Sequence, residues 1–198
     1  MKIKVAILTT SFMFVVLTTA TAAPIYTFPI AGCTVKYGKY HHDYPATDID
    51  AKKGCAFVAP IAGVIDEVNT VDKWSGKTNI GADRGGLSIS IIGEDGLRYY
   101  GSHLAKIETN IVPGYKVATG EKLGEIGSTG SARGTKAHLH FGISWPTPTQ
   151  PNVWWVRRGV VLPFKYLDAW KAGKDLSPVK EVAAAKLKYG EIPPLPKK

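Results

Sequence analysis

Two histidines separated by a single residue, His138 and His140, carry the clearest chemical signal in the sequence. Side chains two residues apart on a β-strand point to the same face of the sheet, and residues 137–143 alternate like a half-buried strand. The two imidazoles would then be fixed neighbours on a rigid element, which suits a metal site, and Gly142 beside them leaves room for another group to approach. A polar strand face with two solvated histidines is the alternative. The opposite face of this strand is apolar and suits a protein core: Leu139, Phe141 and Ile143.

The other three histidines lie at two points from which side chains could reach the same site: His41, His42 and His103. Residues 38–50 read GKYHHDYPATDID, in which Pro45 excludes a helix interior and predicts a loop that runs into a short strand at residues 47–50. An imidazole and the Asp48 carboxylate together are ligands that zinc accepts. A loop whose aspartates cap local backbone N–H groups is the alternative. His103 falls at the end of another predicted strand, where a side chain can reach a cleft.

The elements that must position these residues are short strands broken by glycine and proline. A hairpin signal, Glu94-Asp95-Gly96, joins two of them. Residues 69–86 are polar and rich in turn formers, which indicates a long loop of the kind that often binds ligands. The fold class we predict is mainly β, with antiparallel sheets in a barrel or sandwich. The expected strands cover residues 54–60, 61–68, 87–91, 97–104 and 122–127.

At 198 residues the chain is long enough for one domain with a sizeable core. We expect residues 23–148 to form the β domain, with its core at 40–145. Residues 149–198 form a C-terminal extension rich in tryptophan and proline that ends in a basic tail. Within it, residues 163–170 and 181–188 predict short helices.

The first residues have the pattern of a secretory signal peptide. Two lysines precede an apolar run at residues 5–17, and the small residues Ala20-Thr21-Ala22 follow. We therefore predict a signal peptide over residues 1–22, cleaved between Ala22 and Ala23. The apolar run is too short to span a bilayer, and no later segment approaches the necessary length. The expected location is extracellular, in the cell wall or in the periplasmic space.

The chain is basic, with a formal net charge of +9. Removal of residues 1–22 takes away two lysines and no acidic residue, which leaves +7. A basic secreted protein is attracted to anionic surfaces. Wall polymers, phospholipid headgroups and nucleic acid all qualify, so charge alone selects none of them.

Cys33 and Cys55 are the only cysteines in the sequence. Two cysteines in an oxidising compartment most simply form a disulfide. A cysteine-based zinc site would need the paired Cys-x-x-Cys spacing that this chain lacks. We predict a Cys33–Cys55 disulfide.

Taken in order, five landmarks resemble the lysostaphin-like (LytM-type) zinc peptidases, which cut peptide cross-bridges in bacterial cell walls. The similarity covers roughly residues 40–143. The landmarks are a His followed by an Asp (His42 and Asp48), the GCAFVAPIAGVI segment, Gly-Ser-His-Leu at His103, the VPGYKVATGEKLGEIGSTG region and AHLHFGI. The resemblance implies a lysostaphin-like antiparallel β fold and a zinc metalloendopeptidase that acts on peptidoglycan peptides.

The family pattern implies one zinc ion per chain, held by His42, Asp48 and His140. His103 and His138 would lie beside the metal as catalytic groups, and the sequence does not divide the roles between them. The usual family motif places three residues between His and Asp, whereas five separate His42 from Asp48. The loop at Pro45 can absorb the extra residues, and His41 is the alternative ligand.

Two other functions fit parts of the sequence. A non-catalytic member of the same fold could bind cell wall or regulate another wall hydrolase, although such relatives usually lose metal ligands and this chain retains a full set of candidates. A biotinyl- or lipoyl-like β module has similar glycine-rich turns, but it needs a Met-Lys attachment site that is not evident here. We expect a peptidase that works as a monomer on peptidoglycan, with anionic wall polymers as further partners and no role for nucleic acid.

Overall fold

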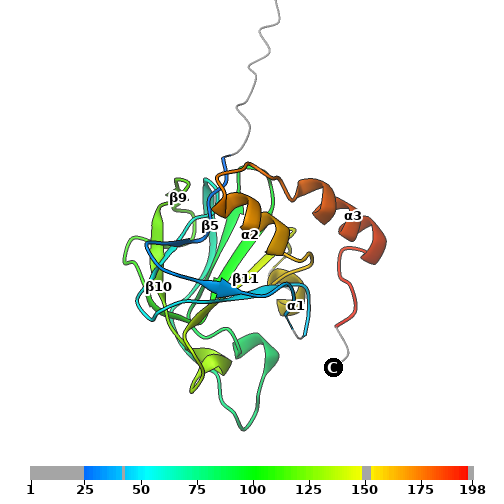
Figure 1. The fold of residues 1–198 in the computed structure, drawn as a ribbon. Helices are drawn as coiled ribbons and strands as arrows, with labels where there is room; N and C mark the ends of the chain where they lie inside the picture. The colour runs from blue at the N-terminus through cyan, green and yellow to red at the C-terminus, as the bar shows by residue number, and fades with distance from the viewer. Residues whose placement is uncertain (1–24, 42, 149–152, 196–198) are drawn as a thin grey trace, which may run out of the picture.

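In the computed structural model, residues 25–41, 43–148 and 153–195 are described. They fold into two antiparallel sheets followed by three helices (Figure 1). The larger sheet has the strand order β2 (Lys36–Tyr37), β3 (Thr47–Asp50), β11 (His138–Ser144), β7 (Arg98–Ser102), β6 (Ser88–Gly93), β5 (Gly63–Asn69) and β9 (Lys116–Val117). The smaller sheet has the order β1 (Ile30–Ala31), β4 (Ala56–Val58), β10 (Lys122–Ile126) and β8 (Leu104–Ile107). The predicted fold class is confirmed, since every strand pair is antiparallel.

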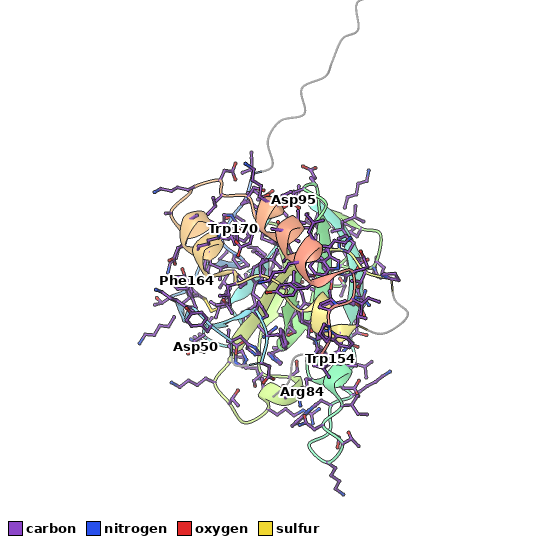
Figure 2. All side chains as sticks on the ribbon, turned by 90° about the vertical axis from the view of Figure 1, so that its right-hand side faces the viewer. Asp50, Arg84, Asp95, Trp154, Phe164 and Trp170 are labelled. Carbon is purple, nitrogen blue, oxygen red and sulfur yellow. A yellow bond between two sulfur atoms is a disulfide. The ribbon has the colours of Figure 1, made fainter. Side chains whose placement is uncertain are left out.

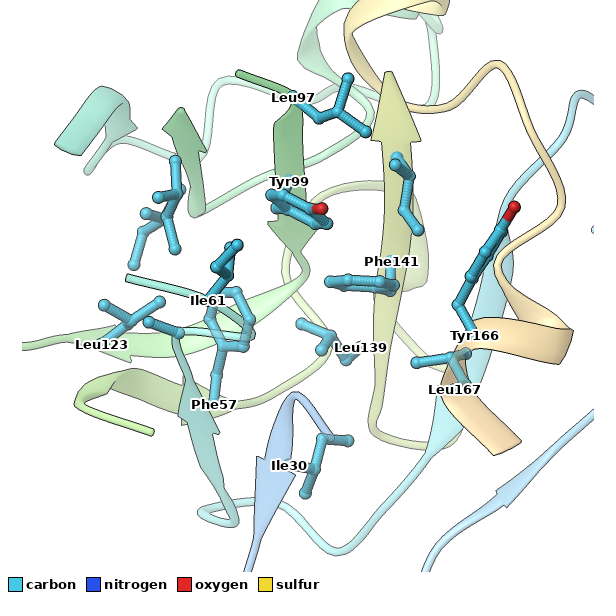
Figure 3. Packing of buried hydrophobic residues seen from close by; sticks show 14 of the residues in the cluster. Ile30, Phe57, Ile61, Leu97, Tyr99, Leu123, Leu139, Phe141, Tyr166 and Leu167 are labelled. Atoms are coloured by element: carbon cyan, nitrogen blue, oxygen red, sulfur yellow. The ribbon is translucent and has the colours of Figure 1, made fainter. Parts of the chain in front are cut away.

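The strand β11 lies in the interior of the larger sheet, between β3 and β7. Its apolar face is fully buried: Leu139, Phe141 and Ile143 have no exposed surface. Figure 3 shows Leu139 and Phe141 between side chains of the smaller sheet, such as Phe57, and side chains of α2, such as Leu167. The predicted alternation of β11 is therefore confirmed, and His138 and His140 are left on the opposite face of the strand.

Three helices follow the sheets: α1 (Trp154–Arg157), α2 (Phe164–Lys171) and α3 (Val179–Tyr189). The two helices predicted in the extension are confirmed as α2 and α3. Trp170 of α2 packs its ring against that of Phe141 at 6.4 Å between centroids, so the extension shares one hydrophobic core with the sheets. No helix in the described ranges is long and apolar enough to cross a membrane.

On the face of β11 that carries His138 and His140, Gly142 packs against the C-terminal extension. A Cβ atom at this position would collide with the backbone carbonyl oxygen of Arg158, just after α1. The group that approaches Gly142 is therefore the protein's own backbone, and the space that we expected near this glycine is already occupied. The outward face of β11 is thus divided between the two histidines and the segment that follows α1.

The predicted disulfide is present between Cys33 and Cys55. It joins the N-terminal segment to the residue that precedes β4, across a sequence separation of 22 residues. The predicted signal peptide lies outside the described residues, so it stays a prediction. The proposed domain boundaries also stay predictions.

Replacing both cysteines by serine should lower the free energy of unfolding by about 3 kcal/mol, because the unfolded chain regains the freedom that a closed loop of this length removes. Denaturant unfolding of the oxidised protein, the reduced protein and the double variant measures this. The reduced protein and the double variant should agree with each other. Equal stability of all three forms would contradict the prediction.

Candidate metal centre

The pairing of β3 with β11 brings two of the predicted ligands together. His140 lies directly opposite Asp48 in the register of these strands, and directly opposite pairs are the closest side-chain neighbours in an antiparallel sheet. His140 Nδ1 donates a hydrogen bond to Asp48 Oδ1 at 2.9 Å. Burial would raise the pKa of the Asp48 carboxyl, but the hydrogen bond from His140 and the charges of the nearby histidines outweigh burial and lower it. Asp48 is therefore an anionic ligand at neutral pH.

The third member of this cluster is His41. Its Nε2 lies 3.8 Å from Asp48 Oδ2, and its ring centroid lies 4.8 Å from that of His140. One ligand atom from each of His41, Asp48 and His140 lies within 4.8 Å of the others. His42, the ligand implied by the family resemblance, lies outside the described residues. The structure thus supports the alternative histidine of the loop and leaves the prediction for His42 without a test.

The donor set of this cluster suits zinc. Two imidazoles and one carboxylate are common zinc ligands, and three protein ligands leave a fourth position open, as in catalytic zinc sites. His140 is 3 % exposed and Asp48 is partly exposed, so the cluster borders a cleft and is not sealed in the core. The three residues are a candidate metal centre.

Tyr44 packs directly on the candidate metal centre and was not found by sequence reasoning. Its hydroxyl lies 3.2 Å from His140 Nε2, and its ring lies 4.8 Å from that of His41. Nδ1 of His140 therefore faces the Asp48 carboxylate and Nε2 faces the Tyr44 hydroxyl, which can either donate or accept a hydrogen bond. Burial raises the pKa of Tyr44 above its usual value, so it is a neutral hydroxyl that fixes the orientation of His140.

His103 lies where the chain leaves β7 in the larger sheet and enters β8 in the smaller one. Its φ of 66° is in the left-handed region, which is uncommon for a residue with a side chain and is found at functional sites. Its Nδ1 lies 2.8 Å from the carbonyl oxygen of Thr129, which can only accept, so Nε2 is the basic nitrogen. Burial and the charges of His140 and His138 lower the pKa of His103 to about 3.

His138 lies beside His103, with ring centroids 4.9 Å apart. Its Nδ1 is 2.8 Å from the carbonyl oxygen of Lys136, so the same argument makes Nε2 its basic nitrogen. His103 is also 6.1 Å from His140 between ring centroids. The structure therefore brings His103 and His138 together next to the candidate metal centre.

These histidines line a cleft with a volume of about 880 Å³. The long loop predicted at residues 69–86 supplies one wall, including Trp74 and Arg84. Figure 2 shows that Arg84, Asp50 and Trp154 lie toward the same end of the molecule. Besides Tyr44, cleft residues that sequence reasoning missed come from this loop, from the segment before β11 and from the extension. Spacing gives no signal there, because each position depends on long-range packing.

Asp72 fastens the loop wall to the segment that precedes β11. Its Oδ2 accepts from the backbone N–H of Gly130 at 2.9 Å and from Arg133 at 2.8 Å. Burial would raise the pKa of Asp72, but the hydrogen bonds from Gly130 and Arg133 lower it. Two walls of the cleft are thus joined through one carboxylate.

Comparison with known proteins identifies the family of this chain. The model of peptidase family M23 matches residues 42–152, which is more than half of the chain. The chain belongs to peptidase family M23. A comparison with curated protein sequences gives no match.

Solved structures agree with this assignment. The catalytic domain of lysostaphin from Staphylococcus simulans is 26 % identical, with a TM-score of 0.51 over 68 % of this chain and 92 % of that domain. A putative glycyl-glycine endopeptidase lytM from Ruminococcus gnavus has a TM-score of 0.57 at 21 % identity, over 76 % of this chain. A putative peptidase M23 from Pseudomonas aeruginosa has a TM-score of 0.53 at 21 % identity, over 77 % of this chain. The match spans 62 % of the Ruminococcus gnavus chain and 55 % of the Pseudomonas aeruginosa chain, and at this identity the similarity shows the fold.

Measuring the zinc content of variants tests whether His41 or His42 is the metal ligand. We expect purified His41→Ala and His140→Ala proteins to lose the bound zinc, because each removes one of three ligands, and His42→Ala to keep it. Zinc stoichiometry by atomic emission, with far-UV circular dichroism as a control for folding, makes the measurement. Loss of zinc in His42→Ala and its retention in His41→Ala would reverse the assignment.

Asp72 should make the stability of the protein depend on pH. Because the pKa of Asp72 is lower in the folded state, its carboxylate stabilises the protein. This stabilisation is complete above the pKa of the unfolded state, about 3.9, and is lost as the pH falls through the pKa of the folded state. Replacing Asp72 by Asn should therefore reduce stability at pH 7, by on the order of 1 kcal/mol, and the difference from wild type should begin to shrink as the pH falls below about 4 and continue to shrink toward the folded-state pKa. Thermal unfolding of both proteins between pH 3 and pH 7 measures it, and a pH-independent difference would contradict it.

Proposed function

We propose that the mature protein is a zinc metalloendopeptidase that hydrolyses peptide bonds of bacterial peptidoglycan and acts outside the cytoplasm after removal of residues 1–22. One observation carries this proposal. The cluster of His41, Asp48 and His140 borders a cleft in which two further histidines present basic Nε2 atoms. Membership of peptidase family M23 supports the same reaction.

The residues of the cluster would hold the zinc ion, which when bound supplies a Lewis acid for the peptide carbonyl and makes a water molecule more acidic. Asp48 contributes the negative charge, and Tyr44 fixes the ring of His140. His103 and His138 have their Nδ1 atoms tied to backbone carbonyls. Each therefore has Nε2 free to accept a proton from an attacking water and return it to the leaving amine, which is general acid–base catalysis. The lowered pKa of His103 makes it a weak base that stays neutral at pH 7.

The basic character of the chain fits this setting. A formal charge of +7 after removal of residues 1–22 attracts the protein to anionic polymers of a cell wall. The charge steers the protein to the surface on which its substrate lies, and the cleft then selects the peptide. We propose that the protein acts there as a monomer.

Incubation of purified protein with isolated wall sacculi tests the proposal. We expect turbidity to fall, a chelator to stop the reaction, and added zinc to restore it. Mass spectrometry of the soluble fragments identifies the peptide bond that is cut. His103→Ala and His138→Ala should each reduce kcat at least 100-fold with unchanged zinc stoichiometry, because general acid–base groups contribute about 10²–10⁴-fold.

Lys53→Ala is the matched control, since Lys53 is exposed and lies in a turn outside the cleft. This variant should retain wild-type turnover. A protein that binds sacculi and zinc but releases no peptide fragment would support the non-catalytic function instead. Full hydrolysis in both histidine variants would refute the assigned roles.

A further inference from the structure

The helix α1 contributes to the cleft although it lies beyond residues 42–152, which the family model matches. Trp154, its first residue, lines the cleft and is partly exposed. Its ring lies 6.2 Å from that of Tyr44, and the Tyr44 ring lies 5.5 Å from that of His140. A single aromatic ring therefore separates Trp154 from the candidate metal centre.

The Trp154 ring is held in place by its surroundings. A Cβ atom at Gly81 would collide with the indole, so the loop wall has a glycine where the ring packs. The Arg158 guanidinium lies 5.1 Å from the ring centroid. The same guanidinium donates to the carbonyl oxygens of Gly81 and Ala82, at 2.8 and 2.6 Å. Arg158, itself 6 % exposed, thus ties α1 to the loop wall.

A second arginine holds α1 on the sheet. Arg157 lies 2.9 Å from Glu67 and 3.5 Å from Asp66, at the bulge in β5. Arg98 of β7, which is 1 % exposed, pairs with the same Asp66 at 2.5 Å. Arg157 is itself 9 % exposed, and a buried guanidinium that loses its carboxylate partners is unfavourable, so these ion pairs favour the docked position of α1. The neighbouring Trp154 is therefore a fixed wall of the cleft.

We propose that Trp154 is a specificity-determining residue, which contacts an aliphatic side chain of a peptide residue within a few positions of the scissile bond. The inference rests on the proposed function, because it takes a peptide as the occupant of the cleft. An extended peptide advances only about 3.3–3.6 Å per residue, so a chain cleaved at the metal centre passes Trp154 within its first few residues. The exposed part of an indole gains most from apolar contact, and the Arg158 cation beside it disfavours a basic side chain.

The test uses the cut site that digestion of sacculi identifies and synthetic analogues, in which each of the first few residues on either side of that bond is in turn Ala or Gly. Wild-type protein should favour Ala over Gly at one of these positions by about tenfold in kcat/KM, since one methyl or methylene group in an apolar pocket is worth about this much. Trp154→Ala should reduce the ratio to about one, and Trp154→Phe should retain part of it. The dissociation constants of the same analogues for the His138→Ala protein should show the same ratio.

Trp155→Ala is the matched control. Trp155 is the next residue of α1, but its indole N–H donates to the carbonyl oxygen of Pro193 at 2.9 Å, and it does not line the cleft. The control should keep the Ala preference, with zinc content and circular dichroism of all variants checked against wild type. A preference retained in folded Trp154→Ala, an equal loss in Trp155→Ala, or no preference in wild type would each overturn the proposal.

Failure of the proposed function would be seen separately, as intact sacculi after incubation with the wild-type protein. In that case, muropeptides from an unrelated wall digest are measured for binding to the wild-type protein and to Trp154→Ala. Binding that weakens about tenfold in the variant would support the contact at Trp154. Equal binding, or no binding to wild type, would overturn it.

Discussion

The antiparallel pairing of β3 with β11 is the constraint on which the candidate site depends. It places His140 opposite Asp48 and joins the two side chains by a hydrogen bond of 2.9 Å. A slip of one residue in this register would turn both histidines of β11 into the core and bring Leu139 and Phe141 out. Complete burial of those apolar side chains therefore fixes the register and, with it, the geometry of the candidate metal centre.

Periodicity in the sequence placed the candidate site residues His138, His140 and Asp48 on strands, whereas the choice between His138 and His140 as the metal ligand came from the family resemblance. His138, His140 and Asp48 lie on strands whose alternation is visible in the sequence, and the short strands with glycine turns predicted a mainly β fold. The loop histidine could not be predicted with the same certainty, because His41 and Asp48 are joined by a segment with Pro45 and no repeating pattern. Tyr44 in this segment packs against His140, a contact that spacing in the sequence does not predict.

The group that packs against Gly142 could not be predicted from the strand pattern. The missing side chain correctly indicated a close approach, but a strand pattern does not distinguish a ligand from the protein's own backbone. The contact is made by Arg158, sixteen positions along the chain, and depends on how α1 docks. Trp154 and Arg158 were missed for the same reason, since neither belongs to a periodic segment that points to the cleft.

The two histidines of β11 share a face of the strand but have different partners. His140 is opposite Asp48 on β3, whereas His138 lies beside His103. His103 has a positive φ and lies where the chain passes from one sheet to the other. The ring nitrogens of His103 and His138 that face backbone carbonyls are occupied as donors, whereas those of His140 face Asp48 and Tyr44. The strand β11 thus offers different neighbours to its two imidazoles, and the chemical difference between two identical side chains comes from the tertiary fold.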